Sequence, residues 1–264
     1  MVAPDSVYDA LSEALRADAP VALATVTAGT DVGAKLLVRP GTGPLGTLGD
    51  PDLDRVVARD ALGELESGLT VTRHYGRHGE AREREVDVFI ECFAPQPLMI
   101  IFGAVDFTAA LVRAGKMLGF RVTVCDAREV FATSRRFPMA DEVVCDWPDR
   151  FLATIAGKLG PRDAVCVLTH DAKFDVPAIV TALGTHVGYL GAMGSRSTHA
   201  KRVERLREVG VSDAELDRVM APIGLDIGAR TPEETAVAIC AEINARRTGR
   251  AAPSLRDGDG PIHT

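Results

Sequence analysis

The chain has 264 residues, of which 46% are hydrophobic, so it can bury a sizeable core as one large domain or two modest ones. Its net charge of -7 gives no overall basic field, which disfavours nucleic-acid binding and adhesion to an anionic membrane. No apolar run approaches the roughly 18 residues of a membrane helix, and the first residues lack a secretory signal pattern, so we expect a cytoplasmic protein.

The first 93 residues predict a small α+β domain. Apolar residues spaced four apart indicate an amphipathic helix over residues 6–17. A metal site is not expected at His74 and His78, because the glycines around them disfavour a helix that would align the two rings. The other expected elements are strands at 21–27, 34–38, 69–74 and 84–93 and a helix at 51–67.

Beyond a proline-containing linker at residues 93–97, strands and helices alternate. This alternation predicts a Rossmann-like, doubly wound parallel sheet over residues 98–248, followed by a flexible tail at 249–264. The run 98–102 is apolar throughout, as is typical of a strand buried on both faces. Further strands are expected at 121–125, 142–145, 164–168 and 186–190, with helices at 106–118, 149–158, 175–183 and 232–247 and another after residue 194.

The five cysteines include no CxxC pair and are odd in number, which disfavours structural zinc and a disulfide framework. Cys125, Cys145 and Cys166 lie in or beside valine-rich runs, and we expect them to be small buried side chains. Cys92 lies near the expected domain junction and is the candidate for a reactive thiol.

The turn that follows the 98–102 strand stands where a dinucleotide-binding domain carries G-x-G-x-x-G. Only Gly103 of that pattern is present, while Val105 adds a branched side chain and Asp106 adds a negative charge where pyrophosphate would approach. Asp126 ends the next strand, and it is either a ribose-binding carboxylate or an ordinary turn residue. The spacing therefore favours a Rossmann-like fold, whereas the residues disfavour tight NAD(P) binding.

His170, Asp171 and Lys173 follow the strand at 164–168 and reach the edge of the sheet where ligands bind. A His–Asp pair of this kind caps a helix more often than it acts as a base. Because no Ser or Cys motif accompanies it, we infer no catalytic triad.

A glycine-rich turn at the start of a helix follows the next strand. Its free N–H groups and neighbouring guanidinium predict an anion site, with Gly191, Gly194, Ser195 and Arg196 as the candidate residues. The basic residues further along this helix, Lys201, Arg202, Arg205 and Arg207, are interspersed with glutamates and indicate a solvated face.

The stretch 221–235 joins backbone-exposing glycines, a carboxylate and an arginine to a strong helix start. It is interpreted as a ligand-binding loop, and the alternative is an ordinary loop before a well-capped helix. Its candidate residues are Gly224, Asp226, Gly228, Arg230 and the N-cap Thr231.

Together these motifs resemble the XdhC/CoxI family of molybdenum-enzyme maturation factors. The resemblance is close over Thr169-His-Asp171 with Asp175, over residues 188–196 and over residues 221–234, and looser over residues 23–26 and 33–38. It implies a two-domain accessory protein, not an enzyme, that binds molybdenum cofactor as molybdopterin or its dinucleotide form. The resemblance also implies sulfur supply from a cysteine desulfurase and delivery to a molybdenum hydroxylase apoenzyme such as xanthine dehydrogenase or carbon monoxide dehydrogenase.

On this interpretation the cofactor phosphate suits Gly194, Ser195 and Arg196, and a pterin edge suits Asp226. No metal ligand is expected, and a homodimer is compatible with the chain. The full set of candidate cofactor-binding residues is Gly103, Asp126, Thr169, His170, Asp171, Gly191, Gly194, Ser195, Arg196, Gly224, Asp226, Gly228, Arg230 and Thr231.

Three departures from the family pattern lie where ligand would be expected. Residues 29–33 shorten a Ser-x-Pro-Arg turn, residues 49–53 replace a Gly-Gly-Cys motif, and residues 103–108 replace G-x-G-H-x-G. Two alternatives therefore stay open: an NAD(P)-binding oxidoreductase, supported by the fold and Asp126, and an assembly adaptor with a degenerate site that binds no cofactor.

Overall fold

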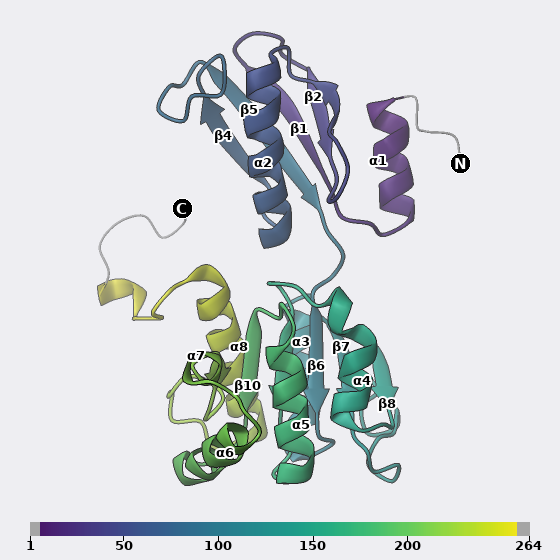
Figure 1. The fold of residues 1–264 in the computed structure, drawn as a ribbon, viewed down its shortest axis with the longest axis vertical. Coiled ribbons are helices and arrows are strands. Elements are labelled where there is room, and N and C mark those ends of the chain that lie inside the picture. The colour runs from purple at the N-terminus through teal and green to yellow at the C-terminus, as the bar shows by residue number, and fades with distance from the viewer. Residues whose placement is uncertain (1–5, 258–264) are drawn as a thin grey trace. The chain divides into compact units, whose positions relative to one another are not determined.

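The computed structural model describes residues 6–257. The chain divides after Pro95 into two compact units (Figure 1). Among the described residues, no helix combines the length and the apolar character that a membrane span requires.

The first unit is built on a five-stranded antiparallel sheet in the order β3-β2-β1-β5-β4. Alternate residues of β1 enter two different cores: Ala22 and Ala24 pack with α2, whereas Val21 and Leu23 pack with α1. The two helices therefore cover opposite faces of the sheet. The elements are α1 (Val7–Arg16), β1 (Val21–Ala28), β2 (Lys35–Val38), β3 (Leu45–Thr47), α2 (Pro51–Ser67), β4 (Val71–Tyr75) and β5 (Val86–Phe93).

Strong local signals fix both ends of α2. The Asp50 carboxylate accepts hydrogen bonds from the N–H groups of Asp52 at 2.9 Å and Leu53 at 3.0 Å, and Pro51 occupies the first helical position. Gly68 ends the helix with a left-handed φ of 68°. The predicted bounds of this helix agree with the structure for these reasons.

The second unit contains a six-stranded parallel sheet in the order β11-β10-β9-β6-β7-β8. Its strands are β6 (Leu98–Phe102), β7 (Arg121–Cys125), β8 (Glu142–Val144), β9 (Ala164–Val167), β10 (Tyr189–Ala192) and β11 (Val219–Met220). Its helices are α3 (Asp106–Met117), α4 (Pro148–Ile155), α5 (Ala172–Leu183), α6 (Arg196–Glu208), α7 (Asp213–Leu216) and α8 (Pro232–Thr248), with short 3-10 turns at Ala156–Lys158 and Leu255–Asp257.

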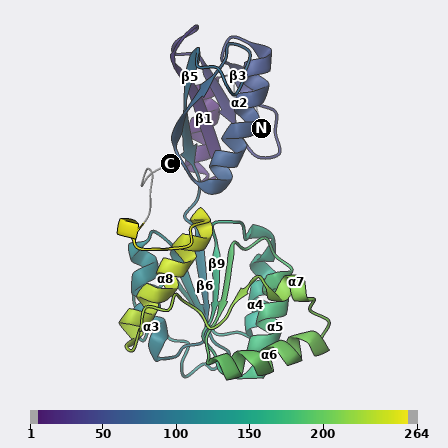
Figure 2. The same cartoon turned by 90° about the vertical axis from the view of Figure 1, so that its left-hand side faces the viewer.

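Helices cover both faces of this sheet. Met99 and Ile101 of β6 point into a core shared with α3 and α8, whereas Ile100 and Phe102 point into a second core shared with α4 and α5. Figure 2 shows α3 and α8 on one side of the sheet and α4 and α5 on the other. The apolar run 98–102 is explained by this burial on both faces, and the predicted fold class is confirmed.

Some predictions differ from the structure. Cys145 was expected to be buried but is exposed, because β8 ends at Val144 and leaves it on the following loop. The strand predicted at 186–190 lies at 189–192, because the Thr185 hydroxyl accepts a hydrogen bond from Val187 N–H in a turn that precedes it. The short elements β3, α7 and β11 were not predicted, since two to four residues carry no measurable period. Of the predicted tail, residues 258–264 lie outside the described part.

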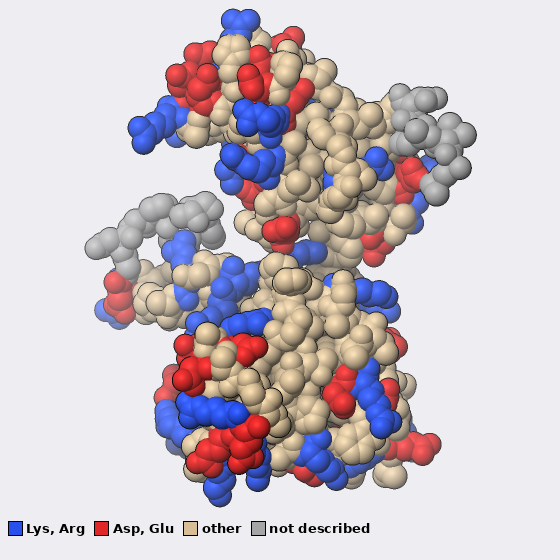
Figure 3. Space-filling view, viewed as in Figure 1, with Lys and Arg blue, Asp and Glu red and all other residues tan. Residues whose placement is uncertain are grey.

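Charged side chains of both signs are distributed over each unit on the face seen in Figure 3. Neither sign forms a continuous field there, in keeping with the modest net charge.

The close packing of Gly188 against Pro161 can be tested by substitution. A Cβ atom at this position would lie 1.9 Å from the Pro161 carbonyl oxygen, so the backbone must shift. We expect Gly188→Ala to lower the free energy of unfolding by about 2 to 3 kcal/mol. Gly157→Ala is the matched control, because its Cβ would meet nothing within 4 Å, and it should be neutral or stabilising by up to about 1 kcal/mol. The fluorescence of Trp147, the single tryptophan, reports unfolding of this unit in urea, and equal midpoints for the two variants would contradict the prediction.

Candidate functional site

The predicted cofactor-binding residues lie at the carboxyl edge of the parallel sheet, on loops and helix starts, apart from Gly191, which lies within β10. From β6 the chain proceeds to β7 and β8 on one side, and then returns to β9 on the other. The turns after β6 and β9 therefore diverge at a topological switch point, which is the usual ligand position in open α/β sheets.

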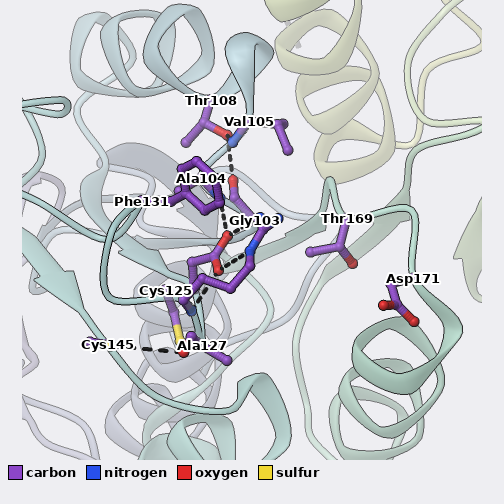
Figure 4. A network of polar contacts seen from close by, with 12 residues as sticks. Gly103, Ala104, Val105, Thr108, Cys125, Ala127, Phe131, Cys145, Thr169 and Asp171 are labelled. Atoms are coloured by element: carbon purple, nitrogen blue, oxygen red, sulfur yellow. Dashed lines mark hydrogen bonds and ion pairs between the residues drawn. The ribbon is translucent and has the colours of Figure 1, made fainter.

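The turn after β6 uses its own amide groups internally. The backbone N–H groups of residues 103, 104 and 105 donate to the Cys125 carbonyl at 2.9 Å, the Asp126 carboxylate at 2.7 Å and the Thr108 hydroxyl at 3.2 Å, respectively (Figure 4). A pyrophosphate cradle requires such N–H groups to be free. None of the amides of residues 103–105 is therefore free to hold a phosphate.

Gly103 is required at this turn for packing. Its φ is 108°, and a Cβ atom there would lie 2.8 Å from Cγ2 of Thr169 on the neighbouring turn. The structure thus brings Gly103 and Thr169 together across the switch point, with no room for a side chain between them.

Asp126 is buried, and its carboxylate is fully engaged. Oδ1 accepts hydrogen bonds from the N–H and Nε of Arg128, both at 2.9 Å, and Oδ2 accepts from Ala104 N–H and Arg128 Nη2, both at 2.7 Å. Burial raises the pKa of Asp126, but these hydrogen bonds outweigh it, so the pKa lies below its ordinary value. The group expected to read a ribose is instead held in an ion pair with Arg128.

An aromatic ring and a second arginine complete this cluster. The Arg128 guanidinium lies 4.4 Å from the centroid of the Phe131 ring, and the Arg136 guanidinium lies 5.3 Å from the same ring. Arg136 Nη1 also donates to the Ala104 carbonyl at 3.0 Å. The peptide groups of Ala104 are therefore held on both sides, by Asp126 and by Arg136.

A buried ion pair joins the turns after β9 and β10. Arg202 Nη2 donates to Asp175 Oδ2 and to the Met193 carbonyl, both at 2.8 Å, and the Thr169 hydroxyl donates to the other carboxylate oxygen of Asp175. Burial raises the pKa of Asp175, while the bonds from Thr169 and Arg202 act in the opposite direction. Arg202 was expected on a solvated face. Instead it is 3% exposed, because it reaches from α6 beneath this turn.

The start of α6 remains open to solvent. Ser195 caps the helix by accepting from Thr198 N–H at 3.1 Å, and its hydroxyl oxygen lies 2.8 Å from that of Ser197. Arg196 is exposed, and the N–H groups of a first helical turn have no acceptor within the helix. Directly behind this turn, His199 Nδ1 and Arg202 Nη1 are buried polar atoms without a hydrogen-bond partner among the described residues. Burial, and then the charge of Arg202, lowers the pKa of His199.

Three of the predicted glycines, Gly191 in β10 and Gly224 and Gly228 in the loop 221–235, have two different roles. A Cβ at Gly191 would lie 2.5 Å from Ile223, and one at Gly224 would lie 3.2 Å from Ala238, so both serve close packing. The buried Glu242 carboxylate accepts from Gly224 N–H at 2.9 Å and holds the loop on α8. Gly228, with φ 74° and open space around it, serves only the turn.

Further residues of this loop face solvent. Thr231 is the N-cap of α8, as the sequence predicted, and Pro232 occupies the first helical position. Thr231 also forms a capping box with Glu234. Asp226 and Arg230 are exposed, and their side chains make no hydrogen bond or ion pair within residues 6–257.

At the start of α5, Asp171 accepts from Lys173 N–H at 3.1 Å and acts as the helix cap, while His170 is exposed. The two side chains do not pair with each other, so the structure agrees with the interpretation of Asp171 as a helix cap and not as the partner of a catalytic base. In the first unit, His74 pairs with Asp87 and His78 with Asp50. No group of three or more metal-ligating side chains occurs within the described range.

The first unit holds a cavity of about 300 Å³ between α2, β4 and the loop after it. Arg73 on its wall pairs with Glu64 and lies 3.5 Å from Asp60. Tyr75 also donates to Asp60 at 3.1 Å, so these charges satisfy one another. None of the predicted site residues lines this cavity.

The pair between Asp175 and Arg202 gives a sharp energetic prediction. Asp175→Ala leaves a buried guanidinium without its carboxylate, and we expect a loss of about 3 to 5 kcal/mol in the free energy of unfolding. Adding Arg202→Leu should recover part of that loss. The control is Arg207→Ala on the same helix, whose exposed partner is Asp213 and whose removal should cost less than about 1 kcal/mol. Urea denaturation measures all three, and equal losses for Asp175→Ala and Arg207→Ala would disprove the assignment.

The lowered pKa of Asp126 predicts that the free energy of unfolding depends on pH. Its folded-state pKa lies below the ordinary 3.8, so its stabilising contribution is present above pH 3.8 and is lost as pH falls through the folded-state pKa. The stability difference between the unmodified chain and Asp126→Asn should therefore be constant from pH 5 to 7 and shrink below pH 3.8. Urea titrations at several pH values measure it. A difference that grew in acid would contradict the ion pair.

Two family models match the chain: the XdhC Rossmann domain over residues 99–243, and the XdhC and CoxI family over residues 14–76. A crystal structure named as a xanthine dehydrogenase from Bacillus halodurans superimposes with a TM-score of 0.54 at 21% identity, covering 93% of this chain and 97% of that one. This likeness shows a shared fold.

Curated relatives are similar over parts of their length. A protein of Bacillus subtilis (strain 168), named as a probable xanthine dehydrogenase subunit, is 33% identical over 161 residues, which are 61% of this chain and 46% of that protein. Molybdenum cofactor insertion chaperone PaoD of Escherichia coli (strain K12) is 33% identical over 99 residues, which are 38% and 31%. Uncharacterized protein YqeB of the same organism is 27% identical over 218 residues, which are 80% and 40%. The chain thus spans less than half of each of these relatives, and because the Rossmann-domain match covers more than half of the chain, the chain belongs to the XdhC and CoxI family.

Proposed function

We propose that this chain binds molybdenum cofactor and delivers it to a molybdenum hydroxylase of the xanthine dehydrogenase type. Family membership supports the proposal, as does the similarity to a protein named as a molybdenum cofactor insertion chaperone. The observation that carries it is the open start of α6, where an anion can be held at the carboxyl edge of the sheet.

The residues at this edge fit a phosphorylated ligand. The first turn of α6 offers backbone N–H groups, the hydroxyl groups of Ser195 and Ser197 and the guanidinium of Arg196, and the dipole of this 13-residue helix favours a negative charge there. Because the turn after β6 has no free N–H group among residues 103–105, the phosphate is assigned to α6.

The loop after β11 fits the heterocycle. Ile223 N–H donates to the Ala192 carbonyl at 3.1 Å, which places the beginning of this loop beside the end of β10. Asp226 and Arg230 are exposed further along it, and they offer an acceptor and a donor to a pterin edge. His170 is a further exposed candidate on the turn after β9. The bound cofactor would supply the oxygen-transfer chemistry of the hydroxylase, whereas the residues of this chain bind and orient it.

The finer assignments also belong to the proposal. The chain acts as an accessory protein, receives sulfur for the cofactor from a cysteine desulfurase, and serves xanthine dehydrogenase or carbon monoxide dehydrogenase. The sequence leaves two alternatives open. An NAD(P)-dependent activity is disfavoured, because the amides of Ala104 and Val105 and the carboxylate of Asp126, which would contact the dinucleotide, are already hydrogen-bonded within the chain. An adaptor that binds no cofactor is tested by the same experiment as the proposal.

The experiment is anaerobic purification from a host that makes molybdopterin, followed by metal and pterin analysis. We expect pterin with the unmodified chain and at least a tenfold reduction for Arg196→Ala, because a charge-assisted hydrogen bond is worth about 1.5 to 3 kcal/mol. Asp226→Ala should reduce pterin as well. Arg205→Ala and Asp217→Ala are matched exposed controls and should retain it.

Unchanged pterin content in both Arg196→Ala and Asp226→Ala would reject the site. Co-purification of the hydroxylase with no pterin at all would favour the adaptor.

A further inference from the structure

The carboxylate at the end of β7 holds the position that contacts a ribose in dinucleotide-binding domains of this fold. Asp126 occupies that position here, one strand from the switch point. An ionised carboxylate has about four acceptor positions, two on each oxygen. All four are filled, three of them by Arg128 and one by Ala104 N–H. A ribose hydroxyl therefore finds no acceptor unless Arg128 leaves.

Arg128 is held in place by more than its carboxylate. Its guanidinium stacks on the Phe131 ring. The Arg136 guanidinium also lies near that ring, and it donates a hydrogen bond to the Ala104 carbonyl. The segment 128–136 is therefore joined to the turn after β6 by Arg136 and to the end of β7 by Arg128. Figure 4 shows Phe131 beside Gly103 and Ala104.

The amides that hold a pyrophosphate in dinucleotide-binding domains are occupied here as well. The amides of residues 103–105 donate within the chain, and Val105 occupies the N-cap of α3 with a branched side chain. The sugar position and the pyrophosphate position are thus both filled by groups of the chain itself.

We propose that Arg128 takes the place of a ribose diol on Asp126 and so opposes the binding of ribonucleotides at the end of β7. The ligand bound at this edge then carries no nucleoside between β6 and β7. If the proposed function holds, the same exclusion applies to the cofactor: the chain carries the pterin as its phosphomonoester in preference to the dinucleotide form. This step rests on the proposed function. The rejection of ribonucleotides at the end of β7 does not depend on that function.

The test measures binding of NADH by fluorescence and of cytidine monophosphate by calorimetry, with purified full-length chain. The unmodified chain should bind neither below millimolar concentration. Arg128→Ala frees the Asp126 carboxylate and should bind cytidine monophosphate at least tenfold more tightly. Arg128 is half exposed, so the variant is expected to fold, and its Trp147 fluorescence checks this.

Three further variants assign the effect. Arg128→Lys keeps the charge but loses the two-pronged contact with Asp126. Its affinity for cytidine monophosphate should lie between those of the unmodified chain and Arg128→Ala. In Arg128→Ala combined with Asp126→Asn the gain should disappear, because the acceptor for the diol is then lost. Arg135→Ala, a neighbouring exposed arginine, should change nothing.

Micromolar NADH binding by the unmodified chain would overturn the inference. No gain in folded Arg128→Ala would do so too, as would a gain that survives Asp126→Asn. These outcomes are independent of pterin content, which tests the proposed function separately.

Discussion

The buried ion pair between Arg202 and Asp175 is the interaction on which the carboxyl edge of the second unit depends. One guanidinium nitrogen contacts a carboxylate that follows β9 and a carbonyl that ends β10. The Thr169 hydroxyl adds a third contact, and Thr169 in turn packs against Gly103 after β6. Three strand ends are thereby fixed relative to one another through one charge pair. Because that pair is out of water, its energy depends on both partners being present.

The need to satisfy buried polar groups also governs where a ligand can bind. Backbone N–H groups that are removed from water need acceptors, and here acidic side chains supply them: Asp126 for Ala104, Asp163 for Leu98 and Glu242 for Gly224. Each such contact satisfies a buried amide. At the carboxyl edge, as at Ala104, it also removes that amide from the set that could hold a phosphate. The start of α6 escapes this because Ser195 satisfies only the amide of Thr198. The proposed anion position thus lies at a different strand end from the one used by dinucleotides in this fold.

Local signals in the sequence were sufficient for much of the fold. The Asp50-Pro51 start and Gly68 end of α2, and the apolar run of β6, are encoded within a few residues, and their bounds could be predicted. The burial of Arg202 could not, because an arginine beside Glu204 on a helix looks solvated until a carboxylate 27 residues away is placed beneath it. The hydrogen bonds from Arg128 to the Asp126 carboxylate could not be predicted from the sequence either. An arginine two residues after an acid is common, and only the close approach of Ala104 and Phe131 fixes its conformation.

The motifs that identify the family divide into two physical classes. At Gly191, Ile223 leaves no room for a Cβ atom, and at Gly224 a left-handed φ of 96° and a tight contact with Ala238 favour glycine. Thr231 begins a helix, so these positions maintain the fold. The side chains of Arg196, Asp226 and Arg230 are exposed and make no hydrogen bond or ion pair with the described residues 6–257, although each lies on a loop or helix start that such packing holds in place. A side chain that contributes nothing to folding yet stands on a rigid support is free to be selected for a ligand. The binding residues of this unit should therefore be sought among these exposed side chains, with the glycines and buried carboxylates as their scaffold.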